Sequence, residues 1–419
     1  KGMRKLVRTV RAWATTSRSV RGVFPPTPGL FDLVVVDEAS QCTVADLLPL
    51  LYRAKRALVI GDPHQLQPVN TLTDQDDRRI QAVHGLRADE LDDRSLTYTG
   101  SSAYHAAASA LAAGGGEVLW LDEHYRCHPD IVDSVNRRFY GDRLAVRTDT
   151  ASLTSPEDPA ARWIDVRGRC ERPGGRSCRN SEEAEAVVDL LRELWTSLPK
   201  EATIGVVSPF TAQVREIEGR LGRDALRRIR VGTAHTFQGG ERDVVVVSPA
   251  AATGVHRSSG QWALRQQNLW NVAVTRARSR LYVVGDRAYW AEQGGLLSDF
   301  ASGSVKATDK TSSDARSRLF EALIAQGVEP KVRHSIEGYT SDLLVSGATG
   351  ETAVIVDRAG VGTSVSLAPG RTLQRTLDHA TLFGKVSGLR TVRVPAWRCL
   401  TEPEAVADEI VKGRTGRSE

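Results

Sequence analysis

The chain has 419 residues, of which 41% are hydrophobic and 26% charged, and it carries a formal net charge of +5. This composition excludes a largely disordered or fibrous protein, and the length suits two to three globular domains. No apolar run approaches the roughly 18 residues that span a bilayer, and the basic first residues lack the apolar core of a secretory signal. We therefore expect a cytoplasmic protein, and the modest basic excess gives only weak support for a polyanionic partner.

The cysteines lack the close paired spacing of zinc and iron–sulfur sites, so we expect reduced and mostly structural thiols. They are Cys42, Cys127, Cys170, Cys178 and Cys399. Only Cys170 and Cys178 lie near each other in sequence, and one such pair does not make a metal site.

Short runs of branched apolar residues, each ended by polar or turn residues, predict strands buried on both faces of a parallel sheet. In chain order these runs are Leu33–Val36, Ala57–Ile60, Val118–Leu121, Ile204–Val207, Val244–Val247 and Leu281–Val284. Helical stretches separate them, so the fold class is α/β. A polar segment of Ser, Thr, Lys and Asp at 302–313 predicts a linker, and the residues beyond it read helix, strands, helix, strand, helix.

Acidic residues follow the first two predicted strands. Asp37 and Glu38 come directly after the first, and Asp62 follows the second. Ligands of open parallel sheets bind at the carboxyl ends of the strands, where one carboxylate can hold Mg²⁺ and a second can act on an attacking water. The alternative is that these acids merely cap the helices that follow.

The residues around these acids resemble motifs of superfamily 1 helicases, in the branch of the nonsense-mediated-decay helicase and its bacterial relatives. VVVDEASQ at 34–41 resembles motif II, and VIGDPHQLQPV at 59–69 resembles motif III. Four later segments resemble further motifs in the same order. They are LDEHYRCHPDI at 121–131, GVVSPFTAQ at 205–213, VGTAHTFQGGERDVVVVS at 231–248 and NLWNVAVTRARSRLYVVGD at 268–286.

The resemblance implies RecA-like parallel-sheet motor domains of the P-loop NTPase fold, with ATP and Mg²⁺ as cofactors. Asp37 would hold the metal, Glu38 would act on the attacking water, and Gln65 would sense the γ-phosphate. Arg126 and Arg276 would neutralise charge on the transferring phosphoryl group. ATP would then be hydrolysed between two lobes.

Further residues are assigned to nucleotide binding by the same resemblance, with Tyr125 stacking on adenine. The others are Asp62, Gly239, Glu241 and Arg278, the last as a substitute for Arg276.

Loops that match nucleic-acid contacts of the family carry hydroxyls, backbone amides and one aromatic ring, which suit a sequence-independent grip on a single strand. Their residues are Pro63, His64, Ser208, Pro209, Phe210, Thr233, His235 and Thr236. Each of them is equally compatible with a turn or a core contact. The partner implied is single-stranded nucleic acid, with DNA favoured over RNA and movement from 5′ to 3′.

No string of the form G-x-x-x-x-G-K-[ST], the phosphate-binding loop of such motors, occurs in the chain. We expect that an N-terminal part with this loop is missing from the sequence. The alternative is a degenerate motor that binds nucleic acid without hydrolysing ATP.

The C-terminal segment resembles small nucleases of the PD-(D/E)XK restriction-endonuclease kind. Asp342 occupies the first metal-ligand position, Ile355 stands where a second acid is expected, and Asp357 lies two residues further on. We therefore expect a catalytically degenerate domain, although an ATP-fuelled helicase that also cuts DNA remains the alternative. The expected parts are 1–115 and 116–301 for the two motor domains, 302–312 for the linker and 313–419 for the endonuclease-like domain.

Overall fold

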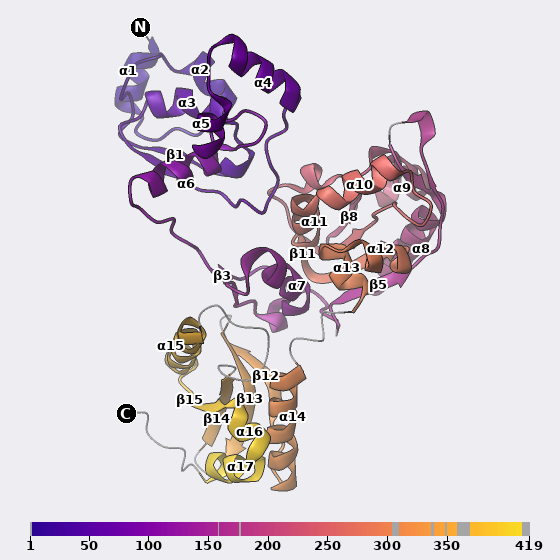
Figure 1. Cartoon of the computed structure of the whole chain (residues 1–419). Coiled ribbons are helices and arrows are strands. Elements are labelled where there is room, and N and C mark those ends of the chain that lie inside the picture. The colour runs from indigo at the N-terminus through magenta and orange to yellow at the C-terminus, as the bar shows by residue number, and fades with distance from the viewer. Residues whose placement is uncertain are drawn as a thin grey trace. The chain divides into compact units, whose positions relative to one another are not determined.

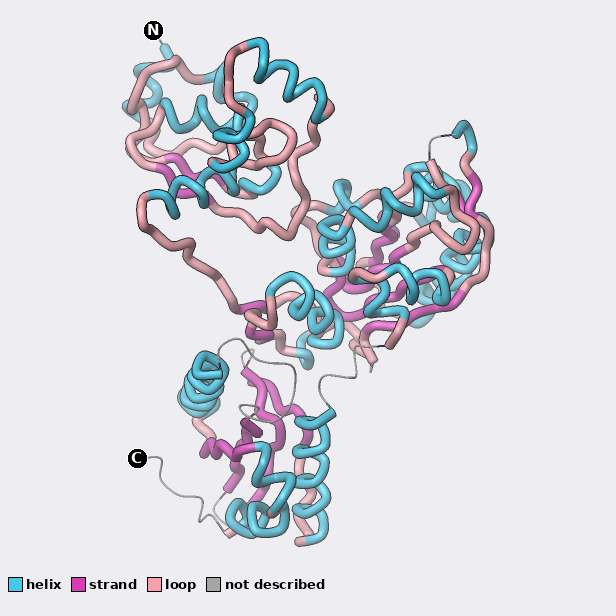
Figure 2. Tube along the Cα trace, viewed as in Figure 1, coloured by secondary structure: helices cyan, strands magenta, loops and turns pink. Residues whose placement is uncertain are grey.

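The structure is a computed structural model (Figures 1 and 2). It describes residues 2–157, 159–175, 177–303, 310–336, 339–347, 350–357 and 369–412. The chain divides into two compact units, Lys1–Leu121 with Gln267–Val272, and Asp122–Gln266 with Ala273–Glu419. Within these described ranges, no helix is long and apolar enough to cross a membrane.

The first unit holds a short parallel sheet covered by helices on one face. Strand β1 (Val34–Val36) pairs with β2 (Ala57–Val59). The helices are α1 (Gly2–Thr9), α2 (Val20–Val23), α3 (Val44–Tyr52), α4 (Asp74–Val83), α5 (Ala88–Asp93) and α6 (Ala103–Ala113). Val36 is buried against α3 and α6, whereas Val35 is 52% exposed and Leu58 49% exposed. The prediction of strands buried on both faces is therefore wrong for this sheet, because the helices that pack on it cover only one face.

The predicted strand at Val118–Leu121 is not formed. Leu119 and Leu121 are 93% and 91% exposed, and this run pairs with no strand in the described part of the chain. A two-residue strand, β3 (Glu123–His124), follows instead and pairs in parallel with β4 (Ala145–Val146). An apolar run alone does not make a strand, since the backbone also needs a hydrogen-bonding neighbour.

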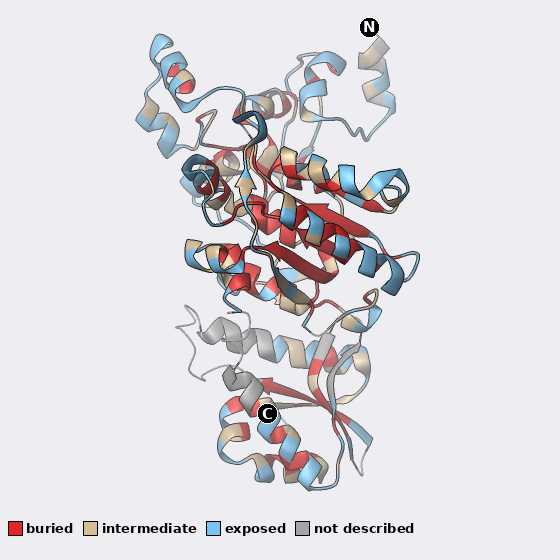
Figure 3. Cartoon of the chain, turned by 90° about the vertical axis from the view of Figure 1, so that its right-hand side faces the viewer, coloured by how far each residue is buried: buried red, intermediate tan, exposed pale blue. Residues whose placement is uncertain are grey.

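The second unit is built on a five-stranded sheet in which every neighbouring pair is parallel. Its order is β5 (Ala161–Asp165), β11 (Ala277–Gly285), β10 (Arg242–Val247), β8 (Ile204–Val207) and β9 (Ile229–Gly232). The three apolar runs predicted as strands in this region are confirmed as β8, β10 and β11, and they are buried on both faces (Figure 3). The α/β fold class with a parallel sheet is thereby confirmed.

Helices and a small hairpin surround this sheet. The helices are α7 (Pro129–Tyr140), α8 (Ser181–Ser197), α9 (Thr211–Ala225), α10 (Arg257–Arg265), α12 (Arg287–Gln293) and α13 (Leu296–Ala301), whereas most of α11 (Gln267–Val274) belongs to the first unit. The hairpin pairs β6 (Cys170–Glu171) with β7 (Arg179–Asn180) in antiparallel fashion. Helices α8 and α9 pack their apolar residues on the sheet and form its main core.

The C-terminal part has the expected order of helix, strands, helix, strand and helix. Its sheet order is β12-β13-β14-β15, with the first two pairs antiparallel and the last pair parallel. The elements are α14 (Lys310–Ala325), β12 (Lys331–Ile336), β13 (Tyr339–Gly347), β14 (Gly350–Asp357), α15 (Pro369–Ser387), β15 (Arg390–Pro395), α16 (Ala396–Thr401) and α17 (Pro403–Val411). Helices α14, α16 and α17 cover one face, and α15 covers the other.

Candidate nucleotide and nucleic-acid sites

The acidic pair of the first unit lies exposed at the carboxyl end of β1. The backbone N–H of Ala39 donates a hydrogen bond to the Ile60 carbonyl at 2.8 Å, which holds the carboxyl ends of β1 and β2 side by side. Glu38 has φ of 52°, a left-handed conformation that is costly for a residue with a side chain. Its N–H donates to Asp37 Oδ1 at 2.9 Å, and Gln41 Nε2 donates to Glu38 Oε2 at 2.9 Å. Both carboxylates are thus aimed by local bonds.

This arrangement fits one carboxylate ligand for Mg²⁺. Asp37 is exposed, and its other oxygen, Oδ2, accepts no hydrogen bond that is recorded among the described residues. Magnesium keeps several waters and takes one or two carboxylates together with phosphate oxygens, so a single exposed Asp is a sufficient protein ligand. Asp37 would hold the ion, which would neutralise phosphate charge.

The loop after β2 is organised by Asp62. His64 N donates to Asp62 Oδ1 at 2.9 Å, and Gln65 Nε2 donates to Asp62 Oδ2 at 3.1 Å. A Cβ on Gly61 would lie 2.9 Å from the backbone nitrogen of Ser40, so glycine allows the two strand-end loops to approach closely. Asp62 therefore orients Gln65, the residue assigned to γ-phosphate sensing.

Two asparagines that our sequence reading missed also hold this loop. Asn268 Nδ2 donates to the carbonyls of Pro63 and Gln65 at 3.1 and 2.9 Å, and Asn271 Nδ2 donates to the His64 carbonyl at 2.8 Å. Both residues belong to the segment that resembles motif VI, which is the signal that was available. Their side chains occupy the loop carbonyls and fix the backbone on either side of His64.

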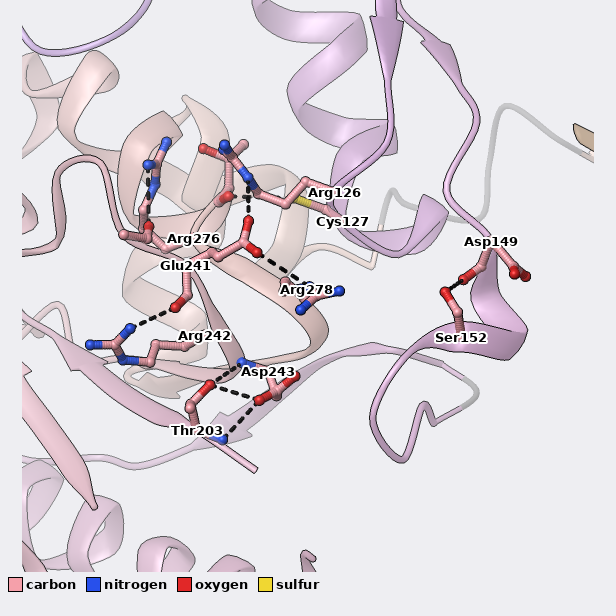
Figure 4. Close-up of polar contacts among 12 residues, drawn as sticks. Arg126, Cys127, Asp149, Ser152, Thr203, Glu241, Arg242, Asp243, Arg276 and Arg278 are labelled. Atoms are coloured by element: carbon pink, nitrogen blue, oxygen red, sulfur yellow. Dashed lines mark hydrogen bonds and ion pairs between the residues drawn. The ribbon is translucent and has the colours of Figure 1, made fainter. Parts of the chain in front are cut away.

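Two arginines in the second unit converge on one carboxylate (Figure 4). Arg126 Nε lies 2.9 Å from Glu241 Oε2, and Arg278 Nε lies 3.6 Å from Glu241 Oε1. All three side chains are partly exposed and line an open pocket of about 420 Å³. The pocket is lined by Glu123, His124, Tyr125, Arg126, Glu241 and Arg278. Four of the residues that the resemblance assigns to the nucleotide therefore line one pocket, namely Tyr125, which is 55% exposed, Arg126, Glu241 and Arg278.

His124 fixes the backbone that carries Tyr125 and Arg126. Burial, reinforced by the charge of Arg126, lowers the pKa of His124 to about 4, so the ring is neutral at physiological pH. Its Nε2 can then accept the backbone N–H of Cys127 at 2.9 Å. The His128 N–H donates to the Arg278 carbonyl at 2.7 Å, which ties this segment to β11.

Arg276 is placed differently from Arg126 and Arg278. It is only 5% exposed, and its Nη1 donates to the Gly240 carbonyl at 3.3 Å. Its own carbonyl accepts the N–H of Arg242 at 2.9 Å. Gly239 beside it has φ of 68°, a conformation that suits glycine. Arg276 thus contacts the loop of motif V, whereas Arg278 reaches the pocket.

The nucleic-acid candidates of the second unit lie at one edge of the sheet. Ser208–Phe210 follows β8 and Thr233–Thr236 follows β9, and these strands are parallel neighbours. His235 and Thr236 are exposed, but Phe210 is only 6% exposed. The Phe210 ring, expected to offer an aromatic face to the strand, therefore packs largely inside. Pro63 and His64 belong to the first unit.

The expected nuclease position offers a poor metal site. Asp342 Oδ2 accepts the N–H of Val356 at 2.8 Å, and its Oδ1 lies 3.8 Å from Arg316. Ile355 is 4% exposed and packs in a small apolar cluster with Phe383. The side chain of Asp357 lies outside the described residues. In the described part of the chain, no group of three His, Cys, Asp or Glu side chains is placed to hold a metal ion.

The chain is similar in sequence to known AAA-domain proteins and to several proteins named as helicases. Two family models described as AAA domain match residues 12–71 and 107–288. Helicase sen1 of Schizosaccharomyces pombe is 30% identical over 270 residues, which are 61% of this chain and 14% of that protein. Probable helicase MAGATAMA 3 of Arabidopsis thaliana is 28% identical over 66% of this chain and 33% of its own length. The 5′-3′ DNA helicase ZGRF1 of Mus musculus is 27% identical over 61% of this chain and 13% of that protein.

These matches make the chain similar to a class of proteins that share AAA domains and are named as helicases. Within that class the chain is similar to the Sen1 and senataxin helicases of yeasts and mammals. The chain spans a third or less of the length of the relatives described above. The solved PRRSV helicase aligns with 97% of this chain and 60% of its own at 14% identity and a TM-score of 0.33.

Proposed function

We propose that the chain is the motor part of an ATP-driven helicase or translocase that moves along single-stranded nucleic acid. Asp37 holds Mg²⁺, Glu38 orients and deprotonates the attacking water, and Arg126 neutralises charge that develops on the transferring phosphoryl group. The observation that carries this proposal is the convergence of Arg126 and Arg278 on Glu241 in an open pocket beside the exposed Tyr125 ring. Fixed guanidiniums at an open pocket suit recognition of phosphate.

In this proposal the nucleic acid is single-stranded DNA, and the motor moves along it from 5′ to 3′. Similarity to a mouse protein named as a 5′-3′ DNA helicase supports both choices. Contacts to the backbone are alike for DNA and RNA unless a 2′-hydroxyl is read, so substrate preference is a matter for direct comparison. Unwinding of partial duplexes with a 5′ or a 3′ overhang, each in DNA and RNA form, gives strand type and direction together.

The test of the catalytic assignment is Glu38→Gln in the full-length protein. We expect ATP turnover to fall to background while nucleotide binding persists, because the amide keeps the shape of the side chain but cannot take a proton from water. Turnover is measured with and without single strands, and binding with a fluorescent nucleotide. Glu117→Gln, which changes an exposed loop carboxylate of the same unit, is the matched control. Turnover of Glu38→Gln close to that of the parent contradicts the role of Glu38.

A further inference from the structure

Helix α10 presents an exposed indole beside the loop that follows β8. The rings of Trp262 and Phe210 have their centroids 5.2 Å apart with an interplanar angle of 47°. Phe210 is 6% exposed, but Trp262 is 41% exposed. Phe210 therefore acts as a rigid support, and Trp262 is the ring of this pair that faces solvent.

The sheet topology places Trp262 at the edge that carries the nucleic-acid candidates. Strands β10, β8 and β9 are parallel neighbours, so their carboxyl ends lie at one edge. Residues 208–210 leave β8 there and residues 233–236 leave β9 there. Residues 248–256 leave β10 at the same edge and lead into α10, which is labelled in Figure 1.

Positive charge accompanies the exposed ring on the same helix. Arg257 and Arg265 are both exposed, and neither forms an ion pair with another residue in the described part of the chain. Trp262 and Arg265 are three positions apart, so they share a face of α10. An indole next to a solvated guanidinium is the combination that binds a base and its phosphate in single-strand grooves.

A second exposed tryptophan, on α8, provides a comparison for the exposed indole on α10. Trp195 on α8 is also 41% exposed, but the guanidinium of Arg228 lies 5.0 Å from its ring. Helix α8 ends shortly before β8 begins, so Trp195 lies toward the amino end of that strand, opposite the candidate loops. The two rings are matched in exposure and differ in surroundings, which makes Trp195 an internal reference.

We propose that Trp262, supported by Phe210, stacks on a base of the bound single strand and that Arg265 contacts the adjoining phosphate. The proposal rests on the proposed function, because it adds a contact to the strand on which that motor moves. Stacking is indifferent to base identity, since every base has a π-face, and so it suits a motor that must pass any sequence.

The test uses labelled oligothymidylate and oligouridylate with the full-length protein. Trp262→Ala should weaken binding about tenfold, Trp262→Phe should restore most of it, and Trp195→Ala should leave it unchanged. The slope of binding against salt separates the two contacts. Arg265→Ala should reduce that slope by about one, whereas Trp262→Ala should leave it as in the parent, because stacking releases no counterions.

A crosslinking readout on the unmodified protein covers the case of a variant that does not fold. Trypsin cleaves after Arg257 and Arg265, so Trp262 lies in the peptide SSGQWALR. Ultraviolet crosslinking to a strand carrying 4-thiothymidine should add nucleotide mass to this peptide. Parent-like binding by Trp262→Ala together with an unmodified peptide overturns the inference alone. Failure of the parent itself to bind single strands overturns both this inference and the proposed function.

Discussion

Glu241 holds two guanidiniums that are assigned to the nucleotide, and this contact sets what each arginine can do. The Glu241 carboxylate lies 2.9 Å from Arg126 Nε and 3.6 Å from Arg278 Nε, and these ion pairs orient both side chains in the lining of the pocket. Fixed cations lose little freedom when charge develops on a ligand, which is the condition for electrostatic stabilisation of a transition state. Arg276 is instead buried on the Gly240 carbonyl, where it also positions the loop that carries Glu241.

We expect Arg126→Ala and Arg276→Ala to lower ATP turnover of the full-length protein by about 10²-fold or more, with little change in single-strand affinity. Arg126 would act directly on transition-state charge, and Arg276 would act by positioning the loop that carries Glu241, so both changes affect the rate rather than ground-state binding of the nucleic acid. Steady-state hydrolysis beside a binding titration measures both effects. Arg192→Ala, which removes an exposed arginine from α8, is the control. Normal hydrolysis with lost strand affinity would show that the residue grips nucleic acid instead.

A second prediction at this scale concerns Glu183, which is fully buried on α8. Its Oε1 accepts hydrogen bonds from Ser248 Oγ at 2.6 Å and from Ala250 N at 2.8 Å, but Oε2 has no partner among the described residues. Burial raises the pKa of Glu183 to about 8, helped by the nearby charge of Asp286. The folded protein therefore holds a proton at neutral pH that the unfolded chain, with an ordinary carboxyl pKa, has lost.

The sign of the pH effect follows from that proton. Between the ordinary pKa of about 4.5 and about 8, the folded state binds more protons, so its stability falls as pH rises. One proton corresponds to about 1.4 kcal/mol per pH unit at most. Urea unfolding is measured from pH 6.5 to 8.5, a range above the pH at which His124 titrates. The free energy of unfolding should fall across this range in the parent and change less in Glu183→Gln. Glu185→Gln, an exposed carboxylate on the same helix, should keep the parent slope. Equal slopes for the parent and Glu183→Gln would mean that Glu183 is charged in the folded protein.

At the scale of elements, the apolar runs predict strands correctly where the strand lies inside a sheet and is buried on both faces. β8, β10 and β11 were found because they are continuous apolar runs buried on both faces. β5 and β9 were missed, since an arginine interrupts each of them. The run Val118–Leu121 predicts a strand, but its backbone pairs with no strand among the residues that the structure describes. Pairing partners come from distant segments, and periodicity does not report them.

In the candidate sites, too, residues within a local sequence pattern could be predicted, whereas residues joined only by tertiary contacts could not. Asp37 and Glu38 were visible because they follow a strand directly in sequence. The convergence of Arg126 with Arg278 and Glu241 was accessible only through the resemblance to a family, because the three residues come from separate segments. Side chains that hold a loop from afar, such as Asn268, have no local signature and needed the structure.

The contact between β8 and the motif V loop gives a prediction at this scale. A Cβ on Gly205 would lie 2.6 Å from the Phe237 ring and 3.1 Å from Arg242 Cγ. Phe237 is 1% exposed and ends the short 3₁₀ helix Ala234–Phe237, so it has no room to yield. Gly205→Ala should therefore destabilise the protein by about 1–3 kcal/mol through overpacking. It should also weaken the binding of single-stranded nucleic acid, because the motif V loop is displaced.

The control for this change is Gly219→Ala on α9. No atom lies within 4 Å of the position of its new Cβ, and alanine favours a helix interior over glycine by about 0.5–1 kcal/mol. Urea unfolding should thus move in opposite directions for the two variants. Unchanged stability of Gly205→Ala would show that β8 and Phe237 can separate at low cost.

At the scale of the whole molecule, the chain joins two α/β parts built on parallel sheets to a C-terminal part with a mixed sheet. In the first unit and in the five-stranded unit, the residues proposed to contact ATP and nucleic acid lie mainly in loops at the edges of the sheets. The C-terminal part has the element order that the sequence predicts, but an order of elements alone does not bring activity. Whether this part can cleave nucleic acid depends on the surroundings of Asp342.

We predict that the C-terminal part does not cut nucleic acid and serves instead to hold it or a partner. Two-metal or one-metal cleavage needs several hard oxygens around the ion, because Mg²⁺ gives up its waters reluctantly. Asp342 is the acid at the expected first position, and its carboxylate already accepts the Val356 N–H and pairs with Arg316. Ile355, at the position of the second acid, offers no oxygen and is buried among apolar side chains.

The experiment incubates the protein with Mg²⁺ or Mn²⁺ and single-stranded, double-stranded and branched substrates. We expect intact substrates throughout. Cleavage that disappears in both Asp342→Ala and Asp357→Ala would show an active site and make the protein an ATP-fuelled helicase–nuclease. Cleavage that persists in both variants points to a contaminant, and Asp378→Ala on α15 of the same part is the matched control for the substitutions. Binding of the same substrates, lowered by Arg316→Ala or Arg318→Ala, would support a holding role, because an uncut strand can still be held through its phosphates by arginine.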